Sequence, residues 1–203
     1  MISREKFHPL AALAEETEKL VLKSISPEEV PSVVLDSMAE TVRHFFRRGI
    51  DHLPPLIEPS VIEHTDGTKT FIGTFNTHSG PDRDLIADVT FVADLVDDKY
   101  AGRAVIVHRG ERFDYGIVAR SWTEPSIQTK TGTEEIRGRG LAERRYHIMN
   151  QVCKRKYGTP LHSGGTNQMS KPLWEKLVKQ GFAERVADVE ENDSGEFRFK
   201  RQV

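Results

Sequence analysis

Two glycines stand directly before a long predicted helix, and arginines surround them. The stretch from Arg137 to Gly140 reads Arg-Gly-Arg-Gly, and Arg144 and Arg145 follow in the first turns of the predicted helix. Glycine lets a backbone approach a ligand closely, and the first amides of a helix have no acceptor within the helix. Because those amides and the helix dipole attract anions, the stretch predicts a phosphate site, and its arginines match two phosphates better than one.

The same glycines have other interpretations. A lone Gly-x-Gly is also typical of a tight turn whose basic neighbours simply face water. The stretch is not a P-loop, because no Gly-Lys-Ser or Gly-Lys-Thr follows Gly140. A Rossmann fingerprint is disfavoured as well, since its third glycine is missing and the two glycines come late, after segments that look like antiparallel strands.

The stretch is similar to the coenzyme A turn of the GNAT family of N-acetyltransferases, which reads Arg/Gln-x-x-Gly-x-Gly/Ala. Arg137, Gly140 and Ala142 match that pattern in register. The family commonly continues with a strand, an asparagine and a helix that reads roughly Asn-x-x-Ala-x-x-Leu-Tyr-x-Lys-Leu-Gly-Phe. The chain has Asn167 and the segment 173–182 at the corresponding place, with three extra residues before its Gly-Phe pair.

The resemblance covers about residues 131–186 and implies a fold, an activity and a site. The fold is an acyl-CoA N-acyltransferase-like α/β (α+β) architecture, a mixed, mostly antiparallel sheet flanked by helices. The activity is transfer of acetyl from acetyl-CoA, the co-substrate, to an amine, without a metal. Asn167 is implied near the pantetheine or the leaving thiol. The pyrophosphate is implied on the turn, whose residues are Arg137, Gly138, Arg139, Gly140, Leu141 and Ala142.

Two places depart from the family pattern. Trp174 stands where the family often has the tyrosine that protonates the departing thiolate, and an indole N–H cannot deliver a proton at neutral pH. The segment 126–132, taken as the strand before the turn, is unusually polar, whereas the family usually has an apolar strand ending in Val-x-Pro. The first departure concerns the acid, and the second concerns the edge that would bind pantetheine.

Acetyl transfer to an amine needs a base for the ammonium proton and a donor for the developing oxyanion. Glu134 and Glu135 are the carboxylates nearest in sequence to the turn, and Glu135 is our first choice as the base. The alternative for either glutamate is pairing with an arginine or with the helix dipole. Further candidates, each with a structural role as its alternative, are His147 and His162 as bases and Tyr115 and Tyr157 as acids.

Other polar clusters favour structural roles. Asp82, Asp84 and Asp88 resemble a cation cluster, but acidic residues between Gly-Pro and a strand usually make turns. The eight histidines lack metal-ligand spacing, so no metal site is predicted. Residues 154–156, Lys-Arg-Lys, complement the dipole at a helix end rather than forming a nucleic-acid patch. Cys153 lies in an apolar helical stripe and is predicted to be buried.

Helices must position the turn, and their signals are apolar residues at helical spacing with Gly and Pro at the ends. The predicted helices are 9–24 and 31–48, which form an N-terminal pair, a helix between Gly140 and Gly158, and a helix over 171–179. A capping-box pattern, Ser-Pro-Glu-Glu, lies at 26–29 between the first two helices.

Extended segments rich in Val, Ile, Phe and Tyr separate the N-terminal helices from the turn. The predicted strands are 70–77, 86–94, 103–108, 114–122, 160–163, 182–186 and an edge strand at 198–203. Residues 105–119 read as an antiparallel hairpin, which agrees with the mostly antiparallel sheet that the resemblance implies.

Length and composition bound the class of protein. The 203 residues include 30% charged residues and carry a net charge of −2, the balance of an ordinary folded protein without a field for nucleic acid or membrane. One domain is predicted, with a helical segment (1–58), a sheet and coenzyme A-binding core (68–187), and a C-terminal tail or edge strand (188–203). A single cysteine, no long apolar run and no secretion signal predict a cytoplasmic protein outside the membrane.

Two functions from different classes are therefore open. The first is an acyl-CoA-dependent N-acetyltransferase acting on an amine of a protein, peptide, nucleobase or small molecule. The second is a catalytically inactive protein of the same fold, for instance an assembly component or oligomer that contacts another chain. Trp174 and the polar strand that begins at Ser126 favour the second function, whereas Arg137, Gly138 and Gly140 together favour the first. The sequence does not determine the acceptor, the base or the oligomeric state.

Overall fold

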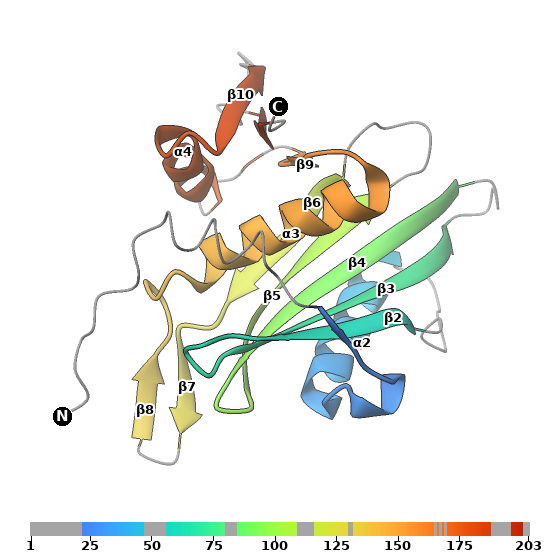
Figure 1. Ribbon diagram of the computed structural model, residues 1–203, viewed down its shortest axis with the longest axis vertical. Helices are drawn as coiled ribbons and strands as arrows, with labels where there is room; N and C mark the ends of the chain where they lie inside the picture. The colour runs from blue at the N-terminus through green and yellow to red at the C-terminus, as the bar shows by residue number, and fades with distance from the viewer. Residues whose placement is uncertain are drawn as a thin grey trace.

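The structure, a computed structural model of the chain, describes residues 22–46, 56–79, 85–108, 116–129, 132–164, 166, 168, 170–187 and 196–200. Within these residues a nine-stranded sheet has helices on both faces, and a two-stranded hairpin stands apart (Figure 1). In spatial order the strands of the sheet are β1 (Lys23–Ser24), β2 (Leu56–Glu63), β3 (Lys69–Ser79), β4 (Leu85–Val96), β5 (Lys99–His108), β6 (Gly116–Thr123), β9 (Leu161–His162), β11 (Glu196–Phe199) and β10 (Ala183–Ala187). Only β6 and β9 pair in parallel, so the predicted mixed, mostly antiparallel α+β sheet is confirmed.

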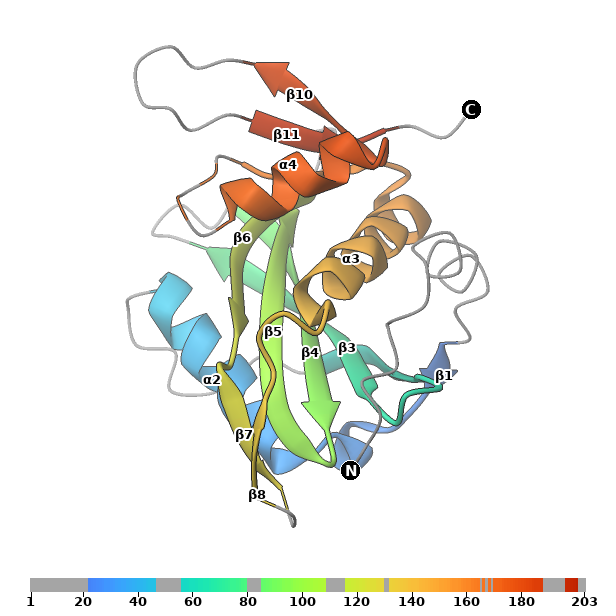
Figure 2. The ribbon, with the colours of Figure 1, turned by 90° about the vertical axis from the view of Figure 1, so that its left-hand side faces the viewer.

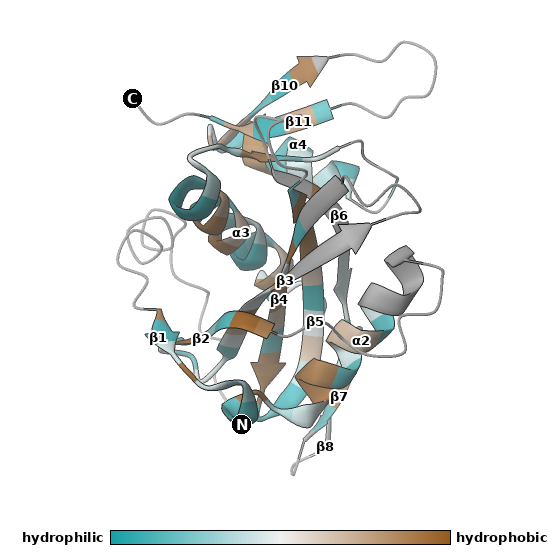
Figure 3. Ribbon diagram, turned by 90° about the vertical axis from the view of Figure 1, so that its right-hand side faces the viewer, coloured by the Kyte–Doolittle hydropathy of each residue, from teal (hydrophilic) through white to brown (hydrophobic). Residues whose placement is uncertain are grey.

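Two long helices lie on opposite faces of this sheet (Figure 2). On one face, α2 (Ser32–Phe46) packs Val34 and Met38 against strands of the sheet. On the other face, α3 (Leu141–Tyr157) packs Ile148 and Met149 onto the sheet. The hydropathy colouring of Figure 3 places apolar segments in the strands between the helices. Burying both faces of the central strands in this way is what makes the sheet a rigid support for the end of α3.

The predicted boundaries of the later helices are confirmed. Gly140 (φ 82°) precedes α3 and Gly158 (φ 68°) ends it, both in the left-handed region that glycine adopts at low cost. Residues 154–156 lie in the last turn of α3, where their positive charge complements the dipole. The next helix, α4 (Lys171–Lys179), has the predicted length and proline in its first turn.

The predicted N-terminal helical pair is only half present among the described residues. The second helix is confirmed as α2, preceded by a short turn, η1 (Pro27–Glu29), in which the Ser26 amide donates to Glu29 Oε2 at 2.7 Å. Residues 1–21, most of the first predicted helix, lie outside the described part of the chain. Its predicted end is wrong, because Lys23 and Ser24 form β1 and pair with β2. Strand pairing here overrides the local helical spacing.

Strand β2 was not predicted. Its first residues, 56–58, fall within the segment 1–58 that was predicted to be helical. Pro59 interrupts its sequence, Glu58 has a positive φ of 50°, and the register with β3 shifts between Ile57 and Ser60. A bulge of this kind breaks the two-residue alternation by which a strand is recognised. The strand is held instead by pairing to β1 and β3 on its two sides.

The C-terminal strand also differs from its prediction. A strand does form near the predicted 198–203, but β11 begins at Glu196 and lies between β9 and β10 rather than at the edge. Phe197 and Phe199 of β11 are buried against α3 and α4. The edge of the sheet is β10, so the prediction of an edge strand at the C-terminus is wrong. The predicted hairpin of residues 105–119 is confirmed as β5 and β6.

Candidate functional site

The turn before α3 is built on two left-handed glycines. The amide of Arg139 donates to the carbonyl of Ile136 at 3.3 Å, which closes a four-residue turn. Gly138, with a φ of 83°, is the third residue of that turn, and Gly140 is the N-cap of α3. A side chain at either position would strain the backbone, so both glycines are required by the path of the chain.

The N-terminus of α3 is open. No side chain of the described residues caps it, and its first backbone hydrogen bond runs from the amide of Arg144 to the carbonyl of Gly140 at 3.0 Å. The amides of residues 141–143 precede that bond and have no acceptor within the helix. A Cβ built on Gly138 or Gly140 would meet no atom within 4 Å. The helix end therefore offers donors to an anion, and the described residues do not crowd the two glycines that precede it.

The polar segment before the turn is a hairpin and not a strand of the sheet. Its strands, β7 (Ser126–Thr129) and β8 (Gly132–Glu135), pair only with each other. The strand of the sheet that leads to the turn is β6, which ends at Thr123. The prediction that 126–132 lines the site as the preceding strand is therefore wrong, and the polarity follows from the position of the hairpin outside the sheet (Figure 1).

The base of this hairpin holds the turn in place. The carbonyl of Pro125 accepts hydrogen bonds from the amides of Ile136 at 2.9 Å and Arg137 at 3.4 Å. An apolar cluster beneath the hairpin joins it to the β4–β5 turn and to the first residue of α3. Its buried members are Val96, Ala101, Ile127, Ile136 and Leu141. The end of β6, the hairpin and the turn thus form one packed unit.

The two arginines in the first turns of α3 face carboxylates rather than the open helix end. Arg145 Nε donates to Asp94 Oδ2 on β4 at 2.9 Å, and both side chains are at most 1% exposed. Arg144 Nη1 donates to Asp66 Oδ2, in the turn between β2 and β3, at 2.8 Å. The sequence indicated positive charge for phosphates at both positions, and that interpretation is wrong for both because the sheet supplies their counter-ions.

The two arginines inside the turn differ from each other. Arg139 forms an ion pair with Glu134 of β8. The guanidinium of Arg137 lies 5.9 Å from the centre of the Trp122 ring, which is exposed at the end of β6. Among the described residues, Arg137 alone of the four arginines has no carboxylate partner. Within the described part of the chain, it is the arginine of the four whose charge is left without a counter-ion.

A buried network continues from α3 into the sheet. Thr70 Oγ1 donates to Asp94 Oδ1 at 2.7 Å, and His64 Nε2 lies 2.8 Å from Thr70 Oγ1. Burial, followed by the positive charge of Arg144, lowers the pKa of His64 to about 4. His64 is therefore neutral at pH 7, and it supports the helix end without adding charge to it.

Strand β6 has an unpaired edge that leads from the turn into the sheet. Its parallel pairing with β9 covers only Gly116 and Ile117, so within the described residues the rest of β6 pairs with β5 alone. The register with β5 also shifts, with Val105 opposite Arg120 and Ile106 opposite Val118. Ala119 is thus an extra residue in a β-bulge, and a bulge redirects backbone groups away from the ladder.

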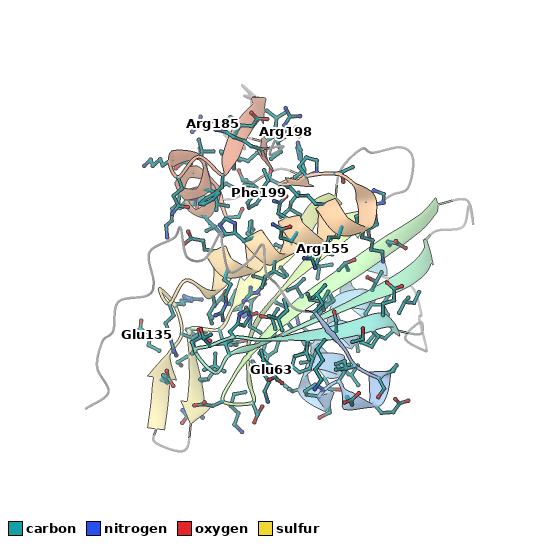
Figure 4. All side chains as sticks on the ribbon, in the orientation of Figure 1. Glu63, Glu135, Arg155, Arg185, Arg198 and Phe199 are labelled. Carbon is teal, nitrogen blue, oxygen red and sulfur yellow. The ribbon has the colours of Figure 1, made fainter. Side chains whose placement is uncertain are left out.

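The two predicted carboxylates both lie on β8, beside the turn. Glu134 forms an ion pair with Arg139, whereas Glu135, which is labelled in Figure 4, is exposed. His147 is packed against Phe182 and Phe199, and burial lowers its pKa. Of these three predicted bases, only Glu135 combines exposure with a position next to the turn.

His162 also has a structural setting. It lies on β9, it is 6% exposed, and its Nδ1 accepts a hydrogen bond from the amide of Gly164 at 3.2 Å. Burial lowers its pKa as well. The structure therefore does not bring the two predicted histidines and the two predicted glutamates into one cluster.

Trp174, at the position of the expected tyrosine, belongs to the core. It is 1% exposed and contacts Tyr146, Phe197 and Phe199 through ring packing. Tyr146 was not considered as a candidate acid from the sequence. Its hydroxyl is hydrogen-bonded to Ser121 of β6, and burial raises its pKa. The signal available was its place one turn into α3, on the same helical face as Met149.

The other predicted acid lies far from the turn. Tyr157 is the last residue of α3, its hydroxyl donates to Asp88 Oδ2 at 3.3 Å, and burial raises its pKa. Tyr115 and Asn167, the predicted acid and the predicted pantetheine contact, lie outside the described residues. Among the described residues, neither Trp174 nor Tyr157 therefore lies beside the turn as an acid for the thiolate.

Three remaining features bear on the class of protein. Cys153 is buried, and burial raises its pKa to about 12, as expected of an inert core residue. In the part of the chain that the structure describes, His, Cys, Asp and Glu do not gather into a group able to hold a metal ion. None of the described helices is both long and apolar enough to cross a membrane.

Comparison with known proteins gives a distant structural match. No family model matches the chain, and no curated protein matches its sequence. The crystal structure of Escherichia coli ElaA matches with a TM-score of 0.44 and 11% sequence identity, over 88% of this chain and 99% of that one. At this level of similarity the match carries no functional information, and the function must be inferred from the geometry of the site.

Proposed function

We propose that the chain is an acyl-CoA-dependent N-acetyltransferase, with the pyrophosphate of acetyl-CoA on the turn from Arg137 to Ala142. The observation that carries the proposal is the N-terminus of α3, where two left-handed glycines precede amides that have no acceptor within the helix. A turn of purely structural use needs the glycines but does not need a helix end without a side-chain cap. The helix dipole adds its partial positive charge at the same point.

The edge of β6 supports the same proposal. Pantetheine is an extended chain with two amide groups, and an extended chain with amides binds well along an unpaired strand edge. From Val118 onward, β6 offers such an edge on the side away from β5. That edge runs to the turn, so one ligand can reach the helix end with its phosphates and the bulge at Ala119 with its thioester.

Residues around the edge have specific tasks in the proposed reaction. The amine attacks the thioester carbon, the carbonyl oxygen becomes an oxyanion, and the thiolate then leaves. Backbone amides at the Ala119 bulge are the proposed oxyanion donors, because the extra residue stands outside the ladder. Glu135, directly or through water, is the proposed base for the ammonium proton. The proton for the thiolate has no assigned donor, since Trp174 is buried in the core.

Calorimetric titration with acetyl-CoA tests the binding half of the proposal. Gly140→Asp places a carboxylate at the helix end, and Gly140→Asn has the same shape without the charge. We expect both to weaken binding, and Asp to weaken it by at least tenfold more than Asn, because the added charge repels phosphate.

Gly158→Asn is the matched control for these variants. Gly158 is also left-handed, and a Cβ there also meets no atom within 4 Å, but it lies at the other end of α3. Its substitution brings a similar backbone strain without touching the site, so acetyl-CoA affinity should not change. Absence of binding by the unmodified chain at millimolar acetyl-CoA would refute the proposal.

Glutamate variants test the catalytic half. Loss of a general base costs typically about 10²- to 10⁴-fold in rate, so Glu135→Gln should lower kcat by that order while acetyl-CoA affinity stays the same. Glu134→Gln instead frees Arg139, and it should leave kcat within a few-fold and tighten acetyl-CoA. Equal rates for Glu135→Gln and the unmodified chain in an acceptor screen would eliminate Glu135 as the base.

A second function is supported by one specific observation. Trp174 and its aromatic neighbours fill the place where a tyrosine acid is expected, and this packing serves stability alone. A protein that binds acyl-CoA, or another chain, without turnover fits that packing. Tight acetyl-CoA binding with no transfer to any amine in the screen would favour this binding or structural role over catalysis.

A further inference from the structure

Trp122, which is exposed, and Arg137 lie next to each other beside the turn. Trp122 is 44% exposed, the highest value among the exposed large apolar side chains described. The guanidinium of Arg137 lies 5.9 Å from the centre of its ring. Trp122 Nε1 donates to Glu124 Oε1 at 3.1 Å, which satisfies the polar atom of the ring and holds its orientation. A tryptophan held exposed in this way does not bury its apolar ring, which leaves the ring open to stack with a ligand.

The pair is rigidly joined to the turn. The Pro125 carbonyl accepts from the amides of Ile136 and Arg137, so the chain leaving β6 is tied to the chain entering the turn. Trp122 lies three residues before Pro125, and Arg137 is the first residue of the turn motif. A ligand whose phosphates occupy the open helix end therefore has the Trp122–Arg137 pair within the reach of its next chemical group.

Charge decides which ligand suits the pair. Arg137 already brings a cation over the ring, and the Glu124 carboxylate is bound to the indole Nε1–H at the ring edge. A second cation such as an amine acceptor therefore gains less over the ring than a planar group that carries a phosphate. A planar, electron-rich ring stacks well on both indole and guanidinium, and a phosphate attached to it pairs with the guanidinium. An adenine nucleotide has both parts.

We propose that Trp122 and Arg137 form a nucleotide subsite, with the adenine stacked on Trp122 and Arg137 bound to a phosphate of the adenosine. The inference rests on the proposed function in one respect, because coenzyme A carries adenosine 3′,5′-bisphosphate as its nucleotide end. Free adenine nucleotides share that chemistry, and the experiment separates them by comparing adenosine 3′,5′-bisphosphate with 5′-ADP.

Ligand titrations against three forms of the chain test this subsite. The forms are the unmodified chain, Trp122→Ala and Trp122→Phe, and the ligands are acetyl-CoA, adenosine 3′,5′-bisphosphate, 5′-ADP and acetyl-pantetheine. Loss of one stacked base weakens binding by about tenfold, so Trp122→Ala should raise the Kd of acetyl-CoA and of the bisphosphate by about that factor. Trp122→Phe should keep most of the affinity, and acetyl-pantetheine should bind all three forms equally.

Fluorescence adds a direct readout of stacking. Trp174 is buried, so quenching by a nucleotide reports mainly on exposed Trp122, and it should disappear in Trp122→Phe. Val186→Ala, which removes another exposed apolar side chain, on β10, is the control for surface changes in general and should bind like the unmodified chain. Tighter binding of the bisphosphate than of 5′-ADP would identify coenzyme A as the source of the nucleotide, and equal binding would identify free nucleotides.

The failure of this inference and the failure of the proposed function give different results. Normal acetyl-CoA binding by Trp122→Ala would overturn the nucleotide subsite and leave the acetyltransferase proposal standing. A rise in the KM of the amine at unchanged acetyl-CoA affinity would overturn it as well, by assigning Trp122 to the acceptor. If the chain binds adenosine 3′,5′-bisphosphate but does not bind acetyl-CoA, the subsite is supported and the acetyltransferase proposal is refuted.

Discussion

Replacing Asp94 with asparagine tests the attachment of α3 to the sheet. Asp94 accepts hydrogen bonds from Arg145 Nε at 2.9 Å and from Thr70 Oγ1 at 2.7 Å. Arg145 Nη1 also donates to the carbonyls of Arg103 at 2.9 Å and Trp122 at 2.8 Å. Asparagine keeps the volume of the side chain and an acceptor for Thr70. It removes the negative charge, so Arg145 becomes a buried cation without a counter-ion.

The magnitude follows from the burial of the pair. Arg145 and Asp94 are 0% and 1% exposed, and removing one partner of a buried ion pair costs about 3 to 5 kcal/mol. The two carbonyl acceptors of Arg145 remain, so we expect the lower end, about 3 kcal/mol of the free energy of unfolding. For a chain of 203 residues this corresponds to a fall in Tm of about 6 to 12 °C.

Urea unfolding followed by circular dichroism measures the loss. Asp66→Asn is the control, because it breaks the ion pair between Arg144 and Asp66, in which the Asp66 side chain is 36% exposed, and it should cost under about 1 kcal/mol. Equal losses for the two variants, or a loss below about 1 kcal/mol for Asp94→Asn, would refute the view that the buried pair fixes α3. The m-value should stay unchanged, since neither variant alters the surface exposed on unfolding.

Three further predictions concern single side chains. Cys153, with its pKa raised to about 12 by burial, should not react with a thiol reagent at pH 8 until urea unfolds the chain. Trp174→Ala should lose about 3 to 5 kcal/mol in urea unfolding, and a smaller loss would show that Trp174 is not packed in the core. The pKa of His64 is about 4 in the folded chain and 6.5 unfolded, so the unfolded chain binds the proton more tightly and stability is lost as pH falls from 6.5 to 4. The urea midpoint should fall less between pH 7 and pH 5 in His64→Gln than in the unmodified chain.

The sequence predicts the helices around the turn well because their signals are local. Gly140 and Gly158 mark both ends of α3, and proline marks the start of α4. Strand β2 could not be predicted in the same way, since Pro59 and a bulge break its alternation and only its neighbours in the sheet define it. Local spacing likewise gave no means of assigning Lys23 to a strand.

In the candidate site, too, local features could be predicted from the sequence and long-range contacts could not. The backbone of the turn was predictable, because glycine before a helix has a specific conformational meaning. The partners of its arginines were not, because Asp66 and Asp94 lie 78 and 51 residues away from Arg144 and Arg145. One signal was available for Asp94, a carboxylate between apolar neighbours in β4, since a charge in such a place needs a buried partner.

The pairing of these arginines changes how the turn must work. With Arg144 and Arg145 neutralised by the sheet and Arg139 held by Glu134, a ligand with phosphates meets backbone amides and Arg137 rather than a cationic patch. A second guanidinium becomes available only when Glu134 releases Arg139, and that release also leaves a free carboxylate beside Glu135. Phosphate binding and the number of free cations at the turn are therefore linked through one partly exposed ion pair, which is weak enough for a ligand to exchange. Such a link suits reversible binding of a phosphate-bearing co-substrate, because the turn gains its second cation only while the ligand competes with Glu134 for Arg139.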